Sequence, residues 1–275
     1  MKTLAGTDTL PLTCTRDGVC CHGHQIWVNP WEVAVLAAGA NLAPRDFAAK
    51  YLDCRATRLA FDGPPDKRGK RGCRIYSADS GCTLHPHRPL TCRVYPLGRG
   101  RTDGVVNYYH TGEALPCLEL CPTVTALPSL TVDDYLAGQD IARGEAATDA
   151  YARVVYGLVA VAGRLCELGG AEIDRARVVG FVDECRSQTR EQRATILPDQ
   201  WMELATMPAG IDHADPVRFA EAHGQLMTSA VQRAASQIEN GLTQAAILHV
   251  ALAMHLAPSV GAELPAMRNI IAPAA

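Results

Sequence analysis

The distribution of cysteine constrains this chain more than any other feature. Nine of its eleven cysteines lie within the first 121 residues, and only Cys166 and Cys185 follow. We expect a cytosolic protein, because the first ten residues hold one Lys and several polar residues instead of the apolar core of a secretory signal. Cytosolic cysteines are kept reduced, so a local excess of them indicates metal ligation or thiol chemistry and argues against disulfides.

Charge and hydrophobic periodicity change where the cysteine density falls. Residues 1–125 hold 15 Lys and Arg against 11 Asp and Glu, a net charge of +4, whereas residues 126–275 hold 11 against 18, a net charge of -7. From Thr131 onward, apolar residues recur with a period near 3.6. We therefore predict a mainly α protein, with a small α+β cysteine-rich domain over residues 1–130 and a helical C-terminal domain over residues 131–275.

Capping signals predict two short helices in the cysteine-rich half. Asn29 can cap a helix over residues 30–39 that has Glu32 at its third position. A second helix is expected to open at Pro44 and to run to Tyr51. The Gly, Pro, Lys and Arg of residues 62–72 indicate a solvated loop, and short strands are expected over residues 73–76 and 105–110.

The C-terminal half is expected to be built on amphipathic helices. Cys166 and Cys185 fall on their apolar stripes, so both are interpreted as small packed thiols. Asp215 is expected to cap a long helix, and residues 242–256 are apolar nearly all round, as in a central buried helix. The apolar run over residues 245–258 contains two histidines and is shorter than the roughly 20 residues that span a bilayer, so no membrane is expected.

Three cysteines and one carboxylate, namely Cys14, Asp17, Cys20 and Cys21, lie within eight residues. Thiolates at such spacings on a loop can bind one soft cation together. The neighbours Cys20 and Cys21 would point to opposite faces of an extended chain, so both can bind one metal only if the chain turns there. In an extended chain, His22 and His24 would share a face with Cys20, although exposed polar residues beside a site are the favoured interpretation of both.

A second group of cysteines follows, at positions 73, 82, 92, 117 and 121. Prolines 86, 89 and 96 fix the direction of the backbone around Cys92. The two groups together exceed the four thiolates of a single zinc site, which favours an iron-sulfur cluster or more than one metal. The first group supplies only three sulfurs, so we expect the two groups to converge in space.

The double cysteine and the Gly-Cys-x5-Arg-Pro-x2-Cys-Arg-x-x-Pro block over residues 81–96 resemble the CxxCxxCC cysteine-cluster family, a YkgJ-type zinc- or iron-chelating domain that is related to flagellin lysine-N-methylase. The likeness spans roughly residues 14–137. It implies a set of metal ligands: Cys14, Cys20, Cys21, Cys73, Cys82, Cys92 and Cys121. Asp17 stands where the family has its second cysteine, and as a harder ligand it would bind a thiophilic metal less well. Cys54 and Cys117 match no family position, and each is open to being a ligand or a packed thiol.

Three functions are compatible with this sequence. The leading hypothesis is a metal-binding protein that holds an iron-sulfur cluster, most simply 4Fe-4S, or zinc, with a redox or electron-transfer role and a protein or redox partner. The first alternative, from the resemblance, is an S-adenosylmethionine-dependent protein lysine N-methyltransferase, but no Gly-x-Gly-x-x-Gly turn is present. The second alternative is a structural zinc module that recruits a partner. No nucleic acid is expected as a partner, and neither a catalytic residue nor an oligomeric state follows from the sequence.

Overall fold

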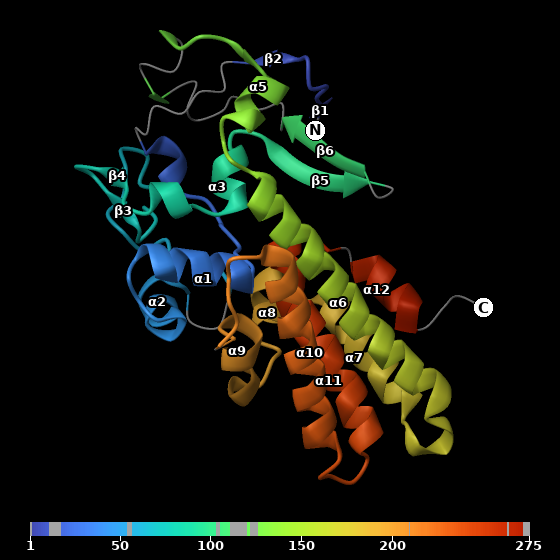
Figure 1. The fold of residues 1–275 in the computed structure, drawn as a ribbon. Coiled ribbons are helices and arrows are strands. Elements are labelled where there is room, and N and C mark those ends of the chain that lie inside the picture. The colour runs from blue at the N-terminus through green and yellow to red at the C-terminus, as the bar shows by residue number, and fades with distance from the viewer. Residues whose placement is uncertain are drawn as a thin grey trace.

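Helix α11 (Gly241–Val260) forms the centre of the C-terminal half in the computed structural model (Figure 1). It packs against α6 (Ala142–Leu168), α10 (Pro216–Ala235) and α7 (Arg175–Ser187). Its length and composition would suffice to cross a membrane, but 72% of its apolar window is buried inside the protein. The apolar residues of α11 therefore belong to a buried core helix, as the sequence predicted.

The structure describes residues 2–10, 18–53, 57–102, 105–110, 120–121, 126–208, 210–262 and 264–271. The remaining helices of these segments are α1 (Pro30–Gly39), α2 (Pro44–Tyr51), α3 (Leu90–Val94), α5 (Val132–Ala137), α8 (Arg190–Ala194), α9 (Asp199–Thr206) and α12 (Leu264–Ile271), with 3-10 turns η1 (Val19–Cys21), η2 (His85–His87) and η4 (Gly170–Glu172). The strands are β1 (Lys2–Thr3), β2 (Thr9–Leu10), β3 (Tyr76–Ser77), β4 (Gly81–Cys82), β5 (Gly98–Thr102), β6 (Val105–His110) and β7 (Leu130–Thr131).

The mainly α fold class is confirmed, and the described strands form only small antiparallel sheets. Strand β6 lies between β1 and β5, β2 pairs with β7, and β3 pairs with β4. The strand expected over residues 105–110 is present as β6. The strand expected over residues 73–76 is wrong except at its last residue, because the Tyr76 N–H donates to the carbonyl of Cys73 at 2.9 Å and closes a turn there.

Both short helices of the N-terminal half have the predicted bounds. Asn29 Oδ1 accepts the N–H of Glu32, and Glu32 accepts the N–H of Asn29, so α1 begins with a complete capping box. Helix α2 begins at Pro44 and ends at Tyr51. Residues 62–72 form the expected loop, in which the carboxylate of Asp66 accepts the N–H of Arg68 and of Lys70.

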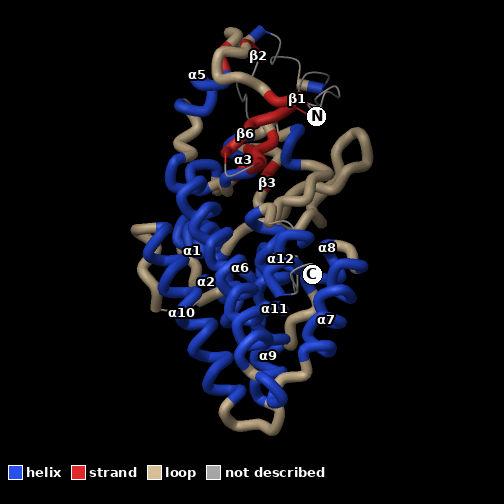
Figure 2. The backbone as a smooth tube through the Cα atoms, turned by 90° about the vertical axis from the view of Figure 1, so that its right-hand side faces the viewer, coloured by secondary structure: helices blue, strands red, loops and turns tan. Residues whose placement is uncertain are grey.

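The two halves of the chain share buried contacts, with the small sheets at one end of the helical body (Figure 2). Trp31 of α1 packs with Tyr151 of α6 and Phe219 of α10, and its Nε1 donates to the carbonyl of His213 at 2.9 Å. Arg99 of β5 forms ion pairs with two carboxylates of α6. The domain boundary at residue 130 stays a prediction, since these contacts join residues on both sides of it.

Packing explains the cysteines and several polar residues of the helical half. Cys166 and Cys185 are both buried in its main core, as expected. Asp215 caps α10 by accepting the N–H groups of Val217 and Arg218. His249 is fully buried, and its Nδ1 lies 2.7 Å from the carbonyl of Ala245.

A buried histidine makes the stability of this helical half depend on pH. His223 Nδ1 lies 2.8 Å from the hydroxyl of Tyr151, its Nε2 lies 2.6 Å from the carbonyl of Leu204, and burial lowers its pKa to about 4. Because the unfolded chain takes up this proton near pH 6.5, the contribution of His223 is complete above that pH and is lost as the pH falls toward 4. We expect a loss of about 3 kcal/mol in the free energy of unfolding between pH 7 and pH 4.

Urea unfolding at pH 7 and pH 4 of the His223→Gln variant checks this expectation. The variant should be less stable at pH 7 but should lose clearly less stability than the parent on acidification. Replacing the exposed His87 with Gln is the matched control and should leave the full pH dependence in place. The same acid loss in the parent and in His223→Gln would contradict the assignment to this side chain.

Candidate metal centre

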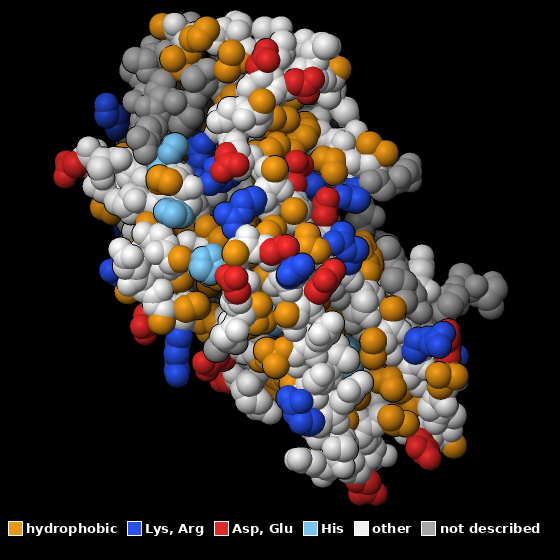
Figure 3. All heavy atoms as spheres, viewed as in Figure 1, with side chains coloured by type: hydrophobic (Ala, Val, Ile, Leu, Met, Phe, Trp, Pro, Cys, Tyr) orange, Lys and Arg blue, Asp and Glu red, His pale blue; other side chains and the backbone are white. Residues whose placement is uncertain are grey.

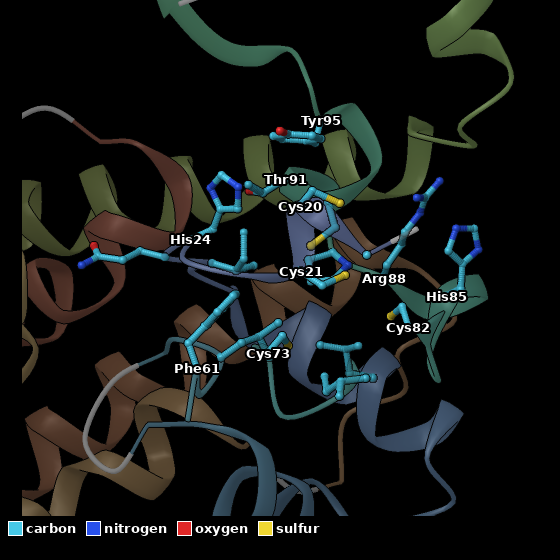
Figure 4. A pocket seen from close by; sticks show the side chains of 18 residues that line it. Cys20, Cys21, His24, Phe61, Cys73, Cys82, His85, Arg88, Thr91 and Tyr95 are labelled. Atoms are coloured by element: carbon cyan, nitrogen blue, oxygen red, sulfur yellow. The ribbon is translucent and has the colours of Figure 1, made fainter. Parts of the chain in front are cut away.

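Five cysteines of the described chain line one cavity of about 160 Å³, namely Cys20, Cys21, Cys73, Cys82 and Cys92. They come from four segments: the 3-10 turn η1, the turn before β3, strand β4 and helix α3. Figure 4 shows four of them, Cys20, Cys21, Cys73 and Cys82, around the common space. The predicted convergence of the two cysteine groups is therefore present for these five residues.

The chain turns at the double cysteine. Gly18 has a φ of 77°, and a side chain there would collide with the ring of Tyr76, so glycine is required before the turn. The Cys73 N–H donates to the carbonyl of Cys21 at 2.7 Å, which holds the turn against the second cysteine group. Since residues 19–21 form a 3-10 turn, Cys20 and Cys21 can both line the same cavity.

The two neighbouring histidines have different surroundings, so the shared face of an extended chain is not observed. His24 lines the cysteine cavity, with its ring edge against Tyr95 at 5.4 Å, and burial lowers its pKa, with a smaller effect from Arg68. His22 packs against Tyr76 instead, and its Nδ1 lies 2.9 Å from the carbonyl of Gly18. Both side chains are half-buried and not exposed.

Glu32 joins helix α1 to the segment that carries Cys92. Its Oε2 accepts the N–H of Asn29 at 3.0 Å, and its Oε1 accepts the N–H of Leu90, the first residue of α3, at 2.8 Å. Burial raises the pKa of Glu32 to about 7, against the opposing effect of these two hydrogen bonds. The sequence predicted only the capping role of Glu32, because the hydrogen bond to Leu90 joins residues 58 positions apart.

The two arginines of the Arg-Pro-x-x-Cys-Arg segment hold backbone around the cavity. Arg93 donates to the carbonyls of Pro86, Arg88 and Gln139 at 2.6, 3.0 and 2.8 Å. Arg88 lines the cavity and donates to the side chain of Gln139. The sequence indicated that the prolines fix the backbone here, but not that these guanidinium groups connect it to the chain after α5.

On the surface of the N-terminal half, histidine side chains gather beside Lys and Arg (Figure 3).

The other predicted ligands are placed differently. Cys121 is buried and is not among the described residues that line this cavity. Cys14 and Asp17 lie outside the described residues, as do Cys54 and Cys117. The complete ligand set therefore stays a prediction. Within the described segments, no three Cys, His, Asp or Glu side chains are already arranged to hold a single ion.

The donor set fits a thiophilic metal. Burial raises the pKa of Cys73 to about 11, and burial together with the nearby thiols of Cys20, Cys73 and Cys82 raises that of Cys92 well above its ordinary value. These thiols therefore stay protonated unless a cation compensates the negative charge that they carry as thiolates. Zinc and iron ions supply that charge and prefer sulfur ligands.

The comparison with protein families agrees with this site. Searches of curated proteins and of solved structures each gave no match. The likeness predicted for residues 14–137 is confirmed only up to residue 111. The confirmed range contains the five cavity cysteines, whereas Cys121 lies beyond it. Over residues 13–111 the chain matches the CxxCxxCC family, described as a "Putative zinc- or iron-chelating domain".

Proposed function

We propose that the cysteine cavity holds an iron-sulfur cluster of the 4Fe-4S type and that the protein acts in electron transfer. The observation that carries this proposal is the number of thiols: five of the eighteen residues that line a cavity of about 160 Å³ are cysteines, one more than a single zinc ion binds. Four sulfurs bound 2.3 Å from one zinc ion lie about 3.8 Å apart, in mutual contact and with no void between them. A cluster fills such a space with its own iron and sulfide.

In this proposal, Cys20, Cys82 and Cys92 are the central ligands, and Cys21 and Cys73 complete the described part of the set. The bound cluster supplies one-electron chemistry. The protein's own residues hold the ligands in place: Glu32 and Arg93 fix the backbone on either side of Cys92. We expect a protein redox partner and a reducing, cytosolic environment. The described sheets are small and antiparallel, so they do not form the parallel sheet of a Rossmann-type site for the methyltransferase alternative.

Metal analysis of anaerobically purified protein tests the proposal. We expect iron and acid-labile sulfide in similar amounts, and broad visible absorbance that bleaches on reduction. The Cys185→Ser variant is the matched control and should keep both, because Cys185 is buried in the core of the helical half and does not line the cysteine cavity. A colourless protein that holds one zinc and no sulfide would overturn the proposal in favour of the structural zinc module.

A further inference from the structure

A basic loop, residues 62–74, lies directly against the double-cysteine turn. The Gly23 N–H donates to the carbonyl of Arg71 at 2.9 Å, and the guanidinium of Arg68 donates to the carbonyl of Val19 at 3.3 Å. Val19 is followed by Cys20, which lines the cysteine cavity (Figure 4). A molecule that contacts this loop would therefore lie beside the turn that carries two of the proposed ligands.

Hydrogen bonds within the basic loop fix the backbone that carries its charges. The Gly63 N–H donates to the carbonyl of Gly72 at 3.0 Å, which pairs the two arms of the loop. At its tip, the carboxylate of Asp66 accepts the N–H of Arg68 and of Lys70, both at 2.9 Å. A partner that binds this preformed loop loses less affinity to conformational ordering than one that binds a loop without such bonds.

The basic loop carries positive charge that the described chain does not neutralise. Residues 62–74 hold five Lys and Arg against two Asp. Each of these two carboxylates is already paired with an arginine of the loop itself. Three exposed cations make no ion pair within the described residues: Lys67, Lys70 and Arg71. Their charge favours a negatively charged partner.

A hollow of about 590 Å³ opens beside these cations. Its apolar lining includes Val19 of η1, Pro65 of the basic loop and Leu120, which is 46% exposed. Lys67 and Arg68 line the same hollow. Apolar surface bordered by charge is the usual composition of a protein–protein interface, whereas a small inorganic anion would leave the apolar part without a partner.

The number of cations favours a protein over a nucleic acid. Nucleic-acid binding depends on many phosphate contacts made at once by a strongly basic surface. The whole chain has a net charge of -3, and the basic loop offers only three cations without an ion pair in the described chain. Three such charges match a local acidic patch on a folded protein.

We propose that the basic loop and the adjoining hollow dock an acidic electron-carrier protein, with its carboxylates against Lys67, Lys70 and Arg71 and an apolar side chain in the hollow. That the partner carries electrons rests on the proposed function, whereas its acidic character follows from the loop. Electron-transfer complexes are typically small and transient, which agrees with a docking surface built from one loop and one hollow.

Association of the metal-loaded full chain with plant-type ferredoxin, a small acidic one-electron carrier, tests the proposal. We expect saturable binding that weakens strongly from about 0.01 M to about 1 M salt, because the Debye length shortens from about 30 Å to about 3 Å. The triple variant Lys67→Gln, Lys70→Gln, Arg71→Gln should keep its metal but associate about tenfold more slowly or less at low salt.

A matched triple variant separates the basic loop from total charge. Arg45→Gln, Arg153→Gln and Arg177→Gln change the net charge equally, at exposed arginines outside the loop and the hollow, and this variant should bind ferredoxin as the parent does. Equal weakening in the two triple variants, no saturable ferredoxin binding at low salt, or equal binding of a single-stranded oligonucleotide would overturn the docking proposal.

Iron, zinc and sulfide measured on the same samples test the cluster separately. A chain that holds zinc without sulfide but still binds ferredoxin through the basic loop would retain the acidic docking surface and overturn the electron-transfer function. A chain that holds the cluster but binds ferredoxin equally well without the three cations would keep the proposed function and overturn the docking surface.

Discussion

The Cys92→Ser variant is expected to lose most of its bound metal and to unfold its N-terminal half at much lower denaturant concentration. Cys92 lines the cavity on α3, near the thiols of Cys20, Cys73 and Cys82. The binding free energy of a metal that organises a small domain is largely folding free energy, so we expect a destabilisation of at least about 3 kcal/mol. Metal content after desalting and urea unfolding of the same preparation measure both effects.

Cys185→Ser is the control that separates ligation from packing. Cys185 is fully buried in the core of the helical half and lines no described cavity, so its replacement costs only the burial of a hydroxyl, about 1 to 3 kcal/mol. Its metal content should equal that of the parent. Equal metal loss from Cys92→Ser and Cys185→Ser would show that the division of the chain into a site and a scaffold is wrong.

The elements that the sequence predicted well are those set by local chemistry. The capping box of Asn29 and Glu32, Pro44 at the start of α2 and the cap at Asp215 each act within four residues. The long helices of the C-terminal half followed from the periodicity of their apolar residues. For such features the neighbours along the chain largely determine the structure, and no tertiary contact has to be known.

The features that sequence analysis missed depend on contacts between distant segments. Nothing in the spacing of Cys73 shows that its N–H bonds to Cys21, yet this bond helps to place the turn of the double cysteine. His22 and His24 point in different directions because Gly23 between them has a φ of 73°, which interrupts the extended chain. The sequence also could not show that Glu32 reaches Leu90, since the two residues are 58 positions apart.

That last contact leads to a second prediction, for the Glu32→Ala variant. The substitution leaves the buried N–H groups of Asn29 and Leu90 without their acceptors. At about 1 to 3 kcal/mol for each unsatisfied group, we expect the free energy of unfolding to fall by about 4 kcal/mol. We also expect metal to be lost faster under a chelator, because the first turn of α3 carries Cys92.

Graded variants at this position distinguish positioning from general damage. Glu32→Gln keeps one acceptor oxygen and should fall between the parent and Glu32→Ala in both stability and metal retention. Glu184→Ala removes an exposed carboxylate from α7 and should match the parent in both. Unchanged metal retention in Glu32→Ala would contradict the positioning role. Because Glu32 is not itself a proposed ligand, faster metal loss in a variant that remains folded would have to be transmitted through Leu90 to the position of Cys92.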